Sequence, residues 1–547
     1  MPHKSKSPNE YRVILQQDAP EPMLRADVPK LTPDILLDYS VRQFESLPVD
    51  VYASDANHAG GTYYNSTVSE RMLSAPKTFR SQQDIRMADR FQSLFDAGTD
   101  PLKIYCKAVH AVGKDYMIRL RMNDLHDVVG QFIGISKPNH RPGTDNLGEP
   151  YYYTAQWKLD HPQCLIGDPT DDTPPESLRY WQRQAMNYAL GQVRQYFYGM
   201  AEELVSGYDL DILELDFIRF TFFFRRAEAY AQRHVMTGLV RRIRKLCDDV
   251  GQQRGRPVRL SARVPDTIEL GLRSGIDTAE WLSQGLLDMV TIGGGYAPFG
   301  TPWQNIVSHA EKAGIPATAC LNHGKFAKDV PRIRAAAHRA HRAGVCGFTL
   351  FNFWYCMDYY HPKGENPLKL DFVQELVDPE RLGTKALAYE ADRIMDHKLV
   401  GRAHFHHSWP GQMPMTIGTA EDGIGQFVTF EIPEASAGRE GFLEARLVLN
   451  ISNFWKHDES LELLWNDELL PEVNYEFRPN QGGEEYRLAC FLPCRKIISG
   501  QNLLEIRLTN RDPRLDPFIS LHRVKLEIPD ENGKLATVNQ EHVKEVF

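Results

Sequence analysis

The sequence predicts an α/β fold, a closed (β/α)8 or TIM barrel followed by an all-β sandwich. Two observations lead to the barrel. Short apolar runs typical of buried strands alternate with helical segments over roughly the first 350 residues, which is the pattern of a parallel sheet. Eight such runs favour a closed barrel over an open doubly wound sheet. The expected strands lie at residues 11–16, 49–54, 116–122, 211–217, 258–264, 287–292, 315–321 and 345–351.

Helical periodicity supports this alternation. Gly207 is expected to end a helix that precedes the fourth strand. A second helix is expected at about 230–250 and a last one at about 384–396. The first two directly precede a strand, as the crossover of a parallel sheet requires. The apolar residues that fall on one face of the first helix are Val193, Tyr196, Phe197, Met200 and Leu204.

The composition changes after about residue 400 to short alternating strands, which predicts a sandwich. Asn466-Asp467 and Ser499-Gly500 are the turn signals between them. We expect a barrel domain at 1–398, a sandwich at 405–530 and a tail at 531–547. The sandwich shows no catalytic-looking cluster of acids or histidines, so we interpret it as an accessory domain. Its expected strands lie at 426–432, 444–450, 461–465, 485–491, 503–508 and 520–528.

One long segment, at about 123–177, follows the third strand, does not show the alternation of strands and helices, and is rich in Pro, Gly and Asp. Barrel sites are assembled from loops at the carboxyl ends of strands. A long loop in that position is usually functional. We therefore interpret the segment as a lid or a wall of a binding cleft.

The overall composition excludes several classes of partner. The 547 residues are 42% hydrophobic and 25% charged, as in globular proteins, and the net charge is -9 without a dense Lys/Arg block. Such a composition does not predict the basic patch with which proteins attract nucleic acid. No run approaches the roughly 18 apolar residues of a membrane span, and the first ten residues are polar. We expect a cytoplasmic protein, or a secreted one whose signal peptide has been removed.

The fourth predicted strand carries two acids, Glu214 and Asp216, within a mostly apolar run. Residues two apart point to the same side of a strand. Buried carboxylates are costly without hydrogen-bond partners, a cation or a chemical role. We therefore expect these acids at an active site, with Asp216 as first candidate. The structural alternative is an ion pair with Arg219 or another arginine.

Polar residues also gather at the other strand ends, which meet at the carboxyl mouth of a barrel. Aromatic residues among them could stack on sugars. The third strand is expected to contribute Arg121, Asn123, Asp124, His126 and Asp127. The remaining candidates for substrate binding are Asp55, His58, Arg219, Arg263, Asp266, Asn322, His323, Asn352, Trp354 and Tyr355, with Asp18, Asn57 and Phe353 nearby.

Acids, a histidine and aromatics around a barrel mouth suit glycoside hydrolysis, in which one carboxyl protonates the leaving oxygen while a second acts as nucleophile or base. Asp216 is expected to be the nucleophile or base. For its partner acid, Asp124 ranks first, followed by Glu214 and Asp266. His126 is expected to relay a proton or bind a substrate hydroxyl. Glu214 lies one layer deeper and is expected to hold an arginine such as Arg121 or Arg263.

Two other functions remain open. One is a catalytically inert carbohydrate-binding barrel. The other is a metal-assisted hydrolase or lyase acting on uronic or sulfated sugars, with Arg121, Arg263, His126 and His323 binding anions. The sequence contains neither an HExxH nor a CxxC motif, so we expect no metal and no cofactor, and buried thiols rather than disulfides. Edges of the sandwich offer a surface for a homo-oligomer.

Short motifs of the barrel region lie at 121–127, 161–162, 165–167, 193–194, 214–219, 263–265 and 351–353. Through these motifs the chain resembles the family 10 glycosyl hydrolase-like proteins, which are TIM-barrel proteins of environmental bacteria that handle complex polysaccharides. The resemblance covers about 10–395 and extends to the sandwich at about 405–530. It implies that Asp216, at the end of strand four, lies near the chemistry. True family 10 xylanases carry a glutamate on strand seven, where this chain has 319–323 without an acid, so the xylanase mechanism does not carry over.

Overall fold

Eight parallel strands close into a barrel in the order β1-β10-β9-β8-β7-β6-β5-β2, which confirms the predicted fold class. Each strand lies within two residues of its predicted position. Their bounds are β1 Val13–Gln17, β2 Val51–Asp55, β5 Asp115–Arg121, β6 Ile212–Asp216, β7 Arg259–Val264, β8 Met289–Ile292, β9 Ala317–Asn322 and β10 Gly347–Phe351.

The computed structural model describes residues 5–18, 28, 30–74, 79, 82–125, 127, 154–167, 183–322, 329–351, 372–392, 409–418, 425–433, 443–455, 457–471, 474–480, 483–512, 514–515 and 518–535. Among these residues, no helix is long and apolar enough to cross a lipid bilayer.

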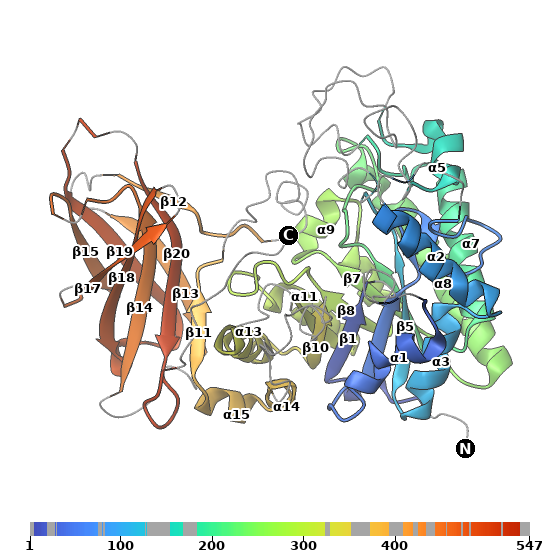
Figure 1. Ribbon diagram of the computed structural model, residues 1–547, viewed down its shortest axis with the longest axis horizontal. Helices are drawn as coiled ribbons and strands as arrows, with labels where there is room; N and C mark the ends of the chain where they lie inside the picture. The colour runs from blue at the N-terminus through green and yellow to red at the C-terminus, as the bar shows by residue number, and fades with distance from the viewer. Residues whose placement is uncertain are drawn as a thin grey trace.

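Helices cover the outside of the barrel (Figure 1). The two predicted crossover helices are α7 Gly191–Gly207 and α8 Ala229–Arg254, and α8 ends at Gly255, whose φ of +69° suits glycine. The others are α1 Pro33–Asp38, α2 Gln82–Asp96, α3 Pro101–Ala111, α5 Gln156–Asp160, α9 Ile268–Arg273, α10 Thr278–Ser283, α11 Gln304–Ala313, α13 Val330–Arg342, α14 Phe372–Leu376 and α15 Pro379–Thr384.

The barrel interior is apolar at only one end. Inward-facing residues near the amino ends of the strands form a small buried hydrophobic cluster. The layers above it are polar and charged, whereas TIM barrels are usually filled with bulky branched side chains. The apolar cluster consists of Tyr11, Ile14, Val51, Ala53, Met117, Ile212 and Met289.

The predicted helix at about 384–396 is wrong. Residues Leu387–Glu390 form a strand, β11, that pairs antiparallel with β20 Ile519–Ile528 of the sandwich. All four residues of β11 are buried. Pairing with a neighbouring sheet has overridden the local helical pattern, which is a common reason for such an error.

The sandwich consists of a six-stranded sheet that contains β11 and a second sheet of four strands. All six predicted strands are present. Asn466 and Asp467 adopt φ of 49° and 67° at the turn between β15 and β16, as their residue types favour. The remaining bounds are β12 Met415–Ile417, β13 Gln426–Ile432, β14 Glu444–Ser452, β15 Ser460–Trp465, β16 Glu468–Leu469, β17 Asn474–Asn480, β18 Gly483–Pro493 and β19 Gly500–Asn510.

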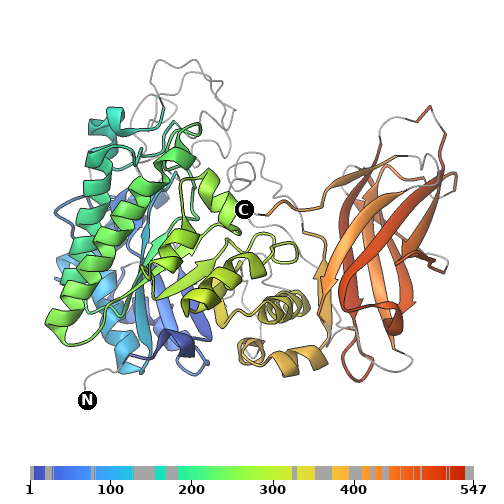
Figure 2. The same cartoon turned by 180° about the vertical axis from the view of Figure 1, so that it is seen from behind.

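Buried ion pairs connect the sandwich to the barrel where α13 lies beside β11 (Figure 2). Oε2 of Glu390 in β11 forms an ion pair with Nε of Arg332 in α13 at 2.6 Å and accepts a hydrogen bond from Arg523 of β20 at 2.7 Å. Lys525 of β20 reaches Asp329, just before α13, at 2.9 Å. Although burial opposes the charge of Glu390, the two arginines lower its pKa to about 2. The carboxylate of Glu390 is therefore a central contact between the two parts.

Replacing Glu390 with Gln should lower the free energy of unfolding by about 2–3 kcal/mol at neutral pH, because two arginines lose their shared partner. The effect should be smaller than for a fully buried pair, since Arg523 is 33% exposed. Because the folded pKa is lowered, the wild-type advantage should disappear as the pH falls from about 4.5 to 2. Urea denaturation at several pH values tests this. Glu431→Gln, which removes a half-exposed partner of Arg339, is the control, and an equal loss in both variants would contradict the account.

Candidate functional site

Two rows of charged side chains cross the barrel interior. The parallel register places residues of neighbouring strands beside one another, and residues two apart on a strand face the same way. Opposite charges alternate along each row, so each charged group has neighbours of the opposite sign. The first row is Asp55 on β2, Arg119 on β5 and Glu214 on β6, and the second is Arg121 on β5, Asp216 on β6 and Arg263 on β7.

Arg119 joins the two rows. Its Nε donates to Oε1 of Glu214 at 2.7 Å, and its Nη2 donates to Oδ2 of Asp216 at 2.8 Å. Its Nη1 lies 3.4 Å from Oδ1 of Asp55. All four side chains are fully buried. One guanidinium thus compensates three carboxyl groups that have no exposed surface in the described part of the structure.

Arg121 holds the acids on the other side of the network. Its Nε donates to Oδ2 of Asp55 at 2.5 Å, and its Nη1 donates to Oδ2 of Asp124 at 2.6 Å. Its Nη2 lies 3.3 Å from Asp18, which is also 3.3 Å from Nη2 of Arg219. The side chains of Asp18 and Arg219 are 14% and 10% exposed. The network therefore comes nearest to solvent at this pair.

The hydrogen-bond partners of Glu214 are side chains on other strands of the barrel. It was expected to hold Arg121 or Arg263, but its arginine is Arg119. Its second oxygen accepts from the hydroxyls of Thr291 at 2.8 Å and Ser261 at 3.1 Å. The side-chain hydrogen bonds of Glu214 thus run to β5, β7 and β8 inside the barrel, which agrees with a role one layer below Asp216.

The surroundings of Asp216 and Asp55 move their pKa values in opposite directions. Burial opposes the charge of Asp216, but Arg119, Arg263 and Arg219 outweigh it and lower its pKa. The backbone N–H of Ile218 also donates to Asp216 at 3.0 Å. For Asp55 burial prevails over Arg121 and Arg119 and raises the pKa to about 6. One carboxyl group is therefore held ionised while the other keeps its proton up to nearly neutral pH.

Several predicted site residues make their contacts outside the two charged rows. The amide of Asn123 donates to the backbone oxygen of Phe222. Asp127 accepts from Lys158 of α5 at 2.7 Å in a buried pair. Asp266 is bound by the backbone N–H of Trp409 at 2.7 Å and by the hydroxyl of Thr301 at 3.1 Å. These contacts position loops around the mouth rather than extend the charged rows.

Other predicted residues lie at the rim or outside the described part of the chain. Asn322 is the buried last residue of β9, beside Phe351. His58 lies on a short strand, β3 Asn57–His58, and pairs through its backbone with β4 Gly61–Thr62. The predicted site residues that lie outside the described part of the chain are His126, His323, Asn352, Trp354 and Tyr355.

Sequence reasoning missed Arg119. The available signal was its spacing, since it lies two residues before Arg121 and therefore faces the same side of β5. What the sequence does not provide is the register that places Arg119 between Asp55 and Glu214.

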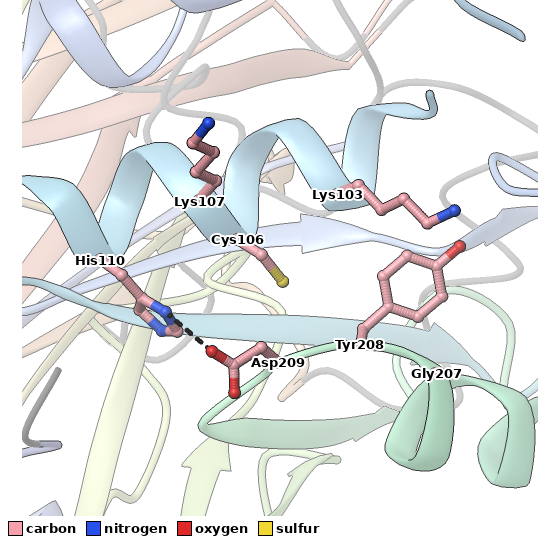
Figure 3. A pocket seen from close by; sticks show the side chains of 7 residues that line it. All are labelled: Lys103, Cys106, Lys107, His110, Gly207, Tyr208 and Asp209. Atoms are coloured by element: carbon pink, nitrogen blue, oxygen red, sulfur yellow. Dashed lines mark ion pairs between the residues drawn. The ribbon is translucent and has the colours of Figure 1, made fainter. Parts of the chain in front are cut away.

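A pocket lies at the opposite end of the barrel, at the amino end of β6, and has a volume of about 440 Å³ (Figure 3). Four of its lining residues come from α3, and Gly207, Tyr208 and Asp209 complete it. Its His110 is paired with Asp211 at 2.7 Å and with Asp209 at 3.5 Å. Burial raises the pKa of its Cys106 thiol, so that thiol is not an activated nucleophile.

The described residues contain no group of three or more His, Cys, Asp or Glu side chains arranged to hold a metal ion. In the two charged rows, guanidinium groups take the places beside the carboxylates that a cation would fill.

Comparisons with known proteins give distant structural similarity only. No family model and no curated protein matches the chain. It is similar to the α-L-fucosidase isoenzyme 2 of Paenibacillus thiaminolyticus, with 13% identity, a TM-score of 0.40 and coverage of 68% of this chain and 48% of that one. It is also similar to the GH36 α-galactosidase AgaA of Geobacillus stearothermophilus, with 11% identity, a TM-score of 0.36 and coverage of 95% and 56%.

A third similar structure is the cycloisomaltooligosaccharide glucanotransferase of a Paenibacillus species, with 11% identity, a TM-score of 0.32 and coverage of 95% and 58%. The chain spans about half the length of these three proteins. All three are carbohydrate-active enzymes, and none of the comparisons supports the family 10 resemblance specifically. Similarity at this level carries no argument about function, so the fold rests on the strand pairing itself.

Asp392, which follows β11, should make the stability of the protein depend on pH. It accepts from the backbone N–H of Gly300, and burial raises its pKa to about 8. A folded carboxyl with a raised pKa stabilises the protein most when protonated, and this contribution is lost as the pH rises to about 8. Asp392→Asn should therefore reduce the fall in melting temperature between pH 6 and pH 9, which a thermal-shift series measures. The surface variant Asp512→Asn should leave that fall unchanged, and an unchanged fall in Asp392→Asn would contradict the assignment.

Proposed function

We propose that the chain is a glycoside hydrolase that cleaves O-glycosidic bonds in a poly- or oligosaccharide with two carboxyl groups, Asp216 and Asp55. The observation that carries the proposal is the opposite displacement of their pKa values around the shared guanidinium of Arg119. Pairs of acids whose surroundings separate their pKa values in this way are typical of acid–base catalysis. Both acids end strands of the barrel at the face where barrel enzymes carry their sites.

The two acids would take different roles. Asp55, protonated up to about pH 6, would donate its proton to the glycosidic oxygen as the bond to the leaving sugar breaks. Asp216, held ionised by Arg119 and Arg263, would attack the anomeric carbon or activate a water molecule. The sequence pattern ranks Asp124 first as the proton donor. Asp124 is paired with Arg121 at 2.6 Å, and the raised pKa of Asp55 moves Asp55 ahead of it.

A second candidate function is a catalytically inert carbohydrate-binding barrel. It is favoured by the engagement of every carboxylate in the rows by arginine, as in a purely structural network. The metal-assisted alternative differs from both, because it requires activity that a chelator removes.

Asp216→Asn and Asp55→Asn should each lower kcat by about 10²- to 10⁴-fold, since each removes a group that acts on the reacting bond. The assay is hydrolysis of a broad glycan panel, including sulfated and uronic polysaccharides, with and without EDTA. Asp211→Asn is the matched control, because Asp211 is a buried, arginine-paired acid just before the same strand, at its opposite end. It should lower stability and leave kcat nearly unchanged.

The outcomes of that assay separate the candidates. Equal rates in the wild type and in Asp216→Asn would contradict the role of Asp216. Binding of glycans without turnover would favour the inert barrel. Activity that EDTA abolishes would favour the metal-assisted enzyme.

The pH dependence of kcat/KM tests the assignment of Asp55 separately. An acid with a pKa of about 6 is protonated below that pH, so the rate should fall about tenfold per pH unit above 6. The lowered pKa of Asp216 should keep the acid limb of the profile below about pH 4. A rate that stays constant from pH 6 to pH 8 would contradict Asp55 as the proton donor.

A further inference from the structure

Arg263 has one guanidinium nitrogen that none of the described residues binds. The residue is fully buried at the end of β7, and its Nε donates to the backbone oxygen of Gly293 at 3.0 Å. Its Nη1 lies 3.5 Å from an oxygen of Asp216 that already accepts from Arg119 at 2.8 Å. Among the described residues, its Nη2 has no hydrogen-bond partner. A buried guanidinium with an unsatisfied donor is costly, so this nitrogen is suited to an incoming acceptor.

A second arginine contacts the same aromatic ring as Arg263. The guanidinium carbons of Arg263 and Arg219 lie 4.1 and 5.0 Å from the centroid of the Phe351 ring. The side chain of Arg219 is 10% exposed and pairs with Asp18, where the network comes nearest to solvent. Both planar cations therefore contact one aromatic ring.

The balance of charge favours an anion on this side. At Asp216 the cations outnumber the carboxylate, since Arg119, Arg263 and Arg219 all lower its pKa. Arg119 also pairs with Asp55 and Glu214, and Arg219 pairs with Asp18. The opposite side, around β1 and β2, has the reverse balance, because Asp18, Asp55 and Asp124 surround Arg121. A negatively charged group would therefore be attracted toward Arg263 and repelled from the acids around Arg121.

We propose that Arg263, assisted by Arg219, binds the carboxylate of a uronic acid unit, so that the substrate class is an acidic glycan. The planar fork of a guanidinium matches the two oxygens of a carboxylate. This inference rests on the proposed function and adds the substrate to it. A sulfate ester offers the same negative oxygens on a non-planar group, and separate arms of the experiment distinguish the two.

The test compares matched ligands. Calorimetry measures the binding of a uronic oligosaccharide and of the same oligosaccharide after reduction of its carboxyl groups, which keeps the linkage and removes the charge. Wild type should bind the acidic form at least about tenfold more tightly, as expected for a charged hydrogen-bonded pair. A sulfated oligosaccharide and its desulfated form make the second arm, and a preference confined to that arm would overturn the carboxylate assignment.

Variants assign the preference to the site. Arg263→Gln should abolish the preference for the acidic ligand, and Arg219→Gln, a change nearer to solvent, should weaken it in a protein whose circular dichroism is unchanged. Arg259→Gln is the control, because Arg259 lies on the same strand at its opposite end. It should retain the preference.

Two results would overturn the proposal: equal binding of the acidic and reduced forms by wild type, and a preference that survives in both the Arg263 and Arg219 variants. Hydrolysis of neutral glycans alone would overturn this inference and leave the proposed function intact. Tight binding of the acidic ligand without hydrolysis would support this inference and contradict the proposed function.

Discussion

The side chain of Arg119 is the contact on which the interior of this barrel depends. It donates to Glu214 and Asp216 on one neighbouring strand and lies 3.4 Å from Asp55 on the other. Taking charges out of water costs several kcal/mol per ion, and only well-placed opposite charges offset that cost. The register of the parallel strands supplies this placement, because it sets Asp55, Arg119 and Glu214 side by side. A shift of one residue would turn these side chains away from the interior.

The composition of the network accounts for the chemistry that we propose. Five carboxyl groups, Asp18, Asp55, Asp124, Glu214 and Asp216, are in contact with four arginines, Arg119, Arg121, Arg219 and Arg263. One carboxyl group is in excess and retains a proton most readily. Asp55, with its pKa of about 6, is that group, while the pKa of Asp216 is lowered by the arginines around it. The same side chains can thus stabilise the barrel interior and supply an acid–base pair.

Much of the fold could be predicted from the sequence because the strands of a parallel barrel are continuous apolar runs separated by amphipathic helices. The spacing of Glu214 and Asp216 likewise predicted that both face one space. The partner of Glu214 could not be predicted, since it depends on which residue of β5 lies opposite, and that is a matter of register. The strand β11 was mistaken for a helix because its partner, β20, lies about 130 residues further along the chain.

The most direct test of the central claim is a double-mutant cycle between Arg119 and Glu214, with the free energy of unfolding measured in urea. Arg119→Met alone and Glu214→Gln alone should each destabilise the protein, because each leaves a buried charge without its partner. In the Arg119→Met background the account predicts that Glu214→Gln becomes stabilising, since it then removes an uncompensated carboxylate. If the two losses simply add, Arg119 does not hold the network together, and the account of the barrel interior is contradicted.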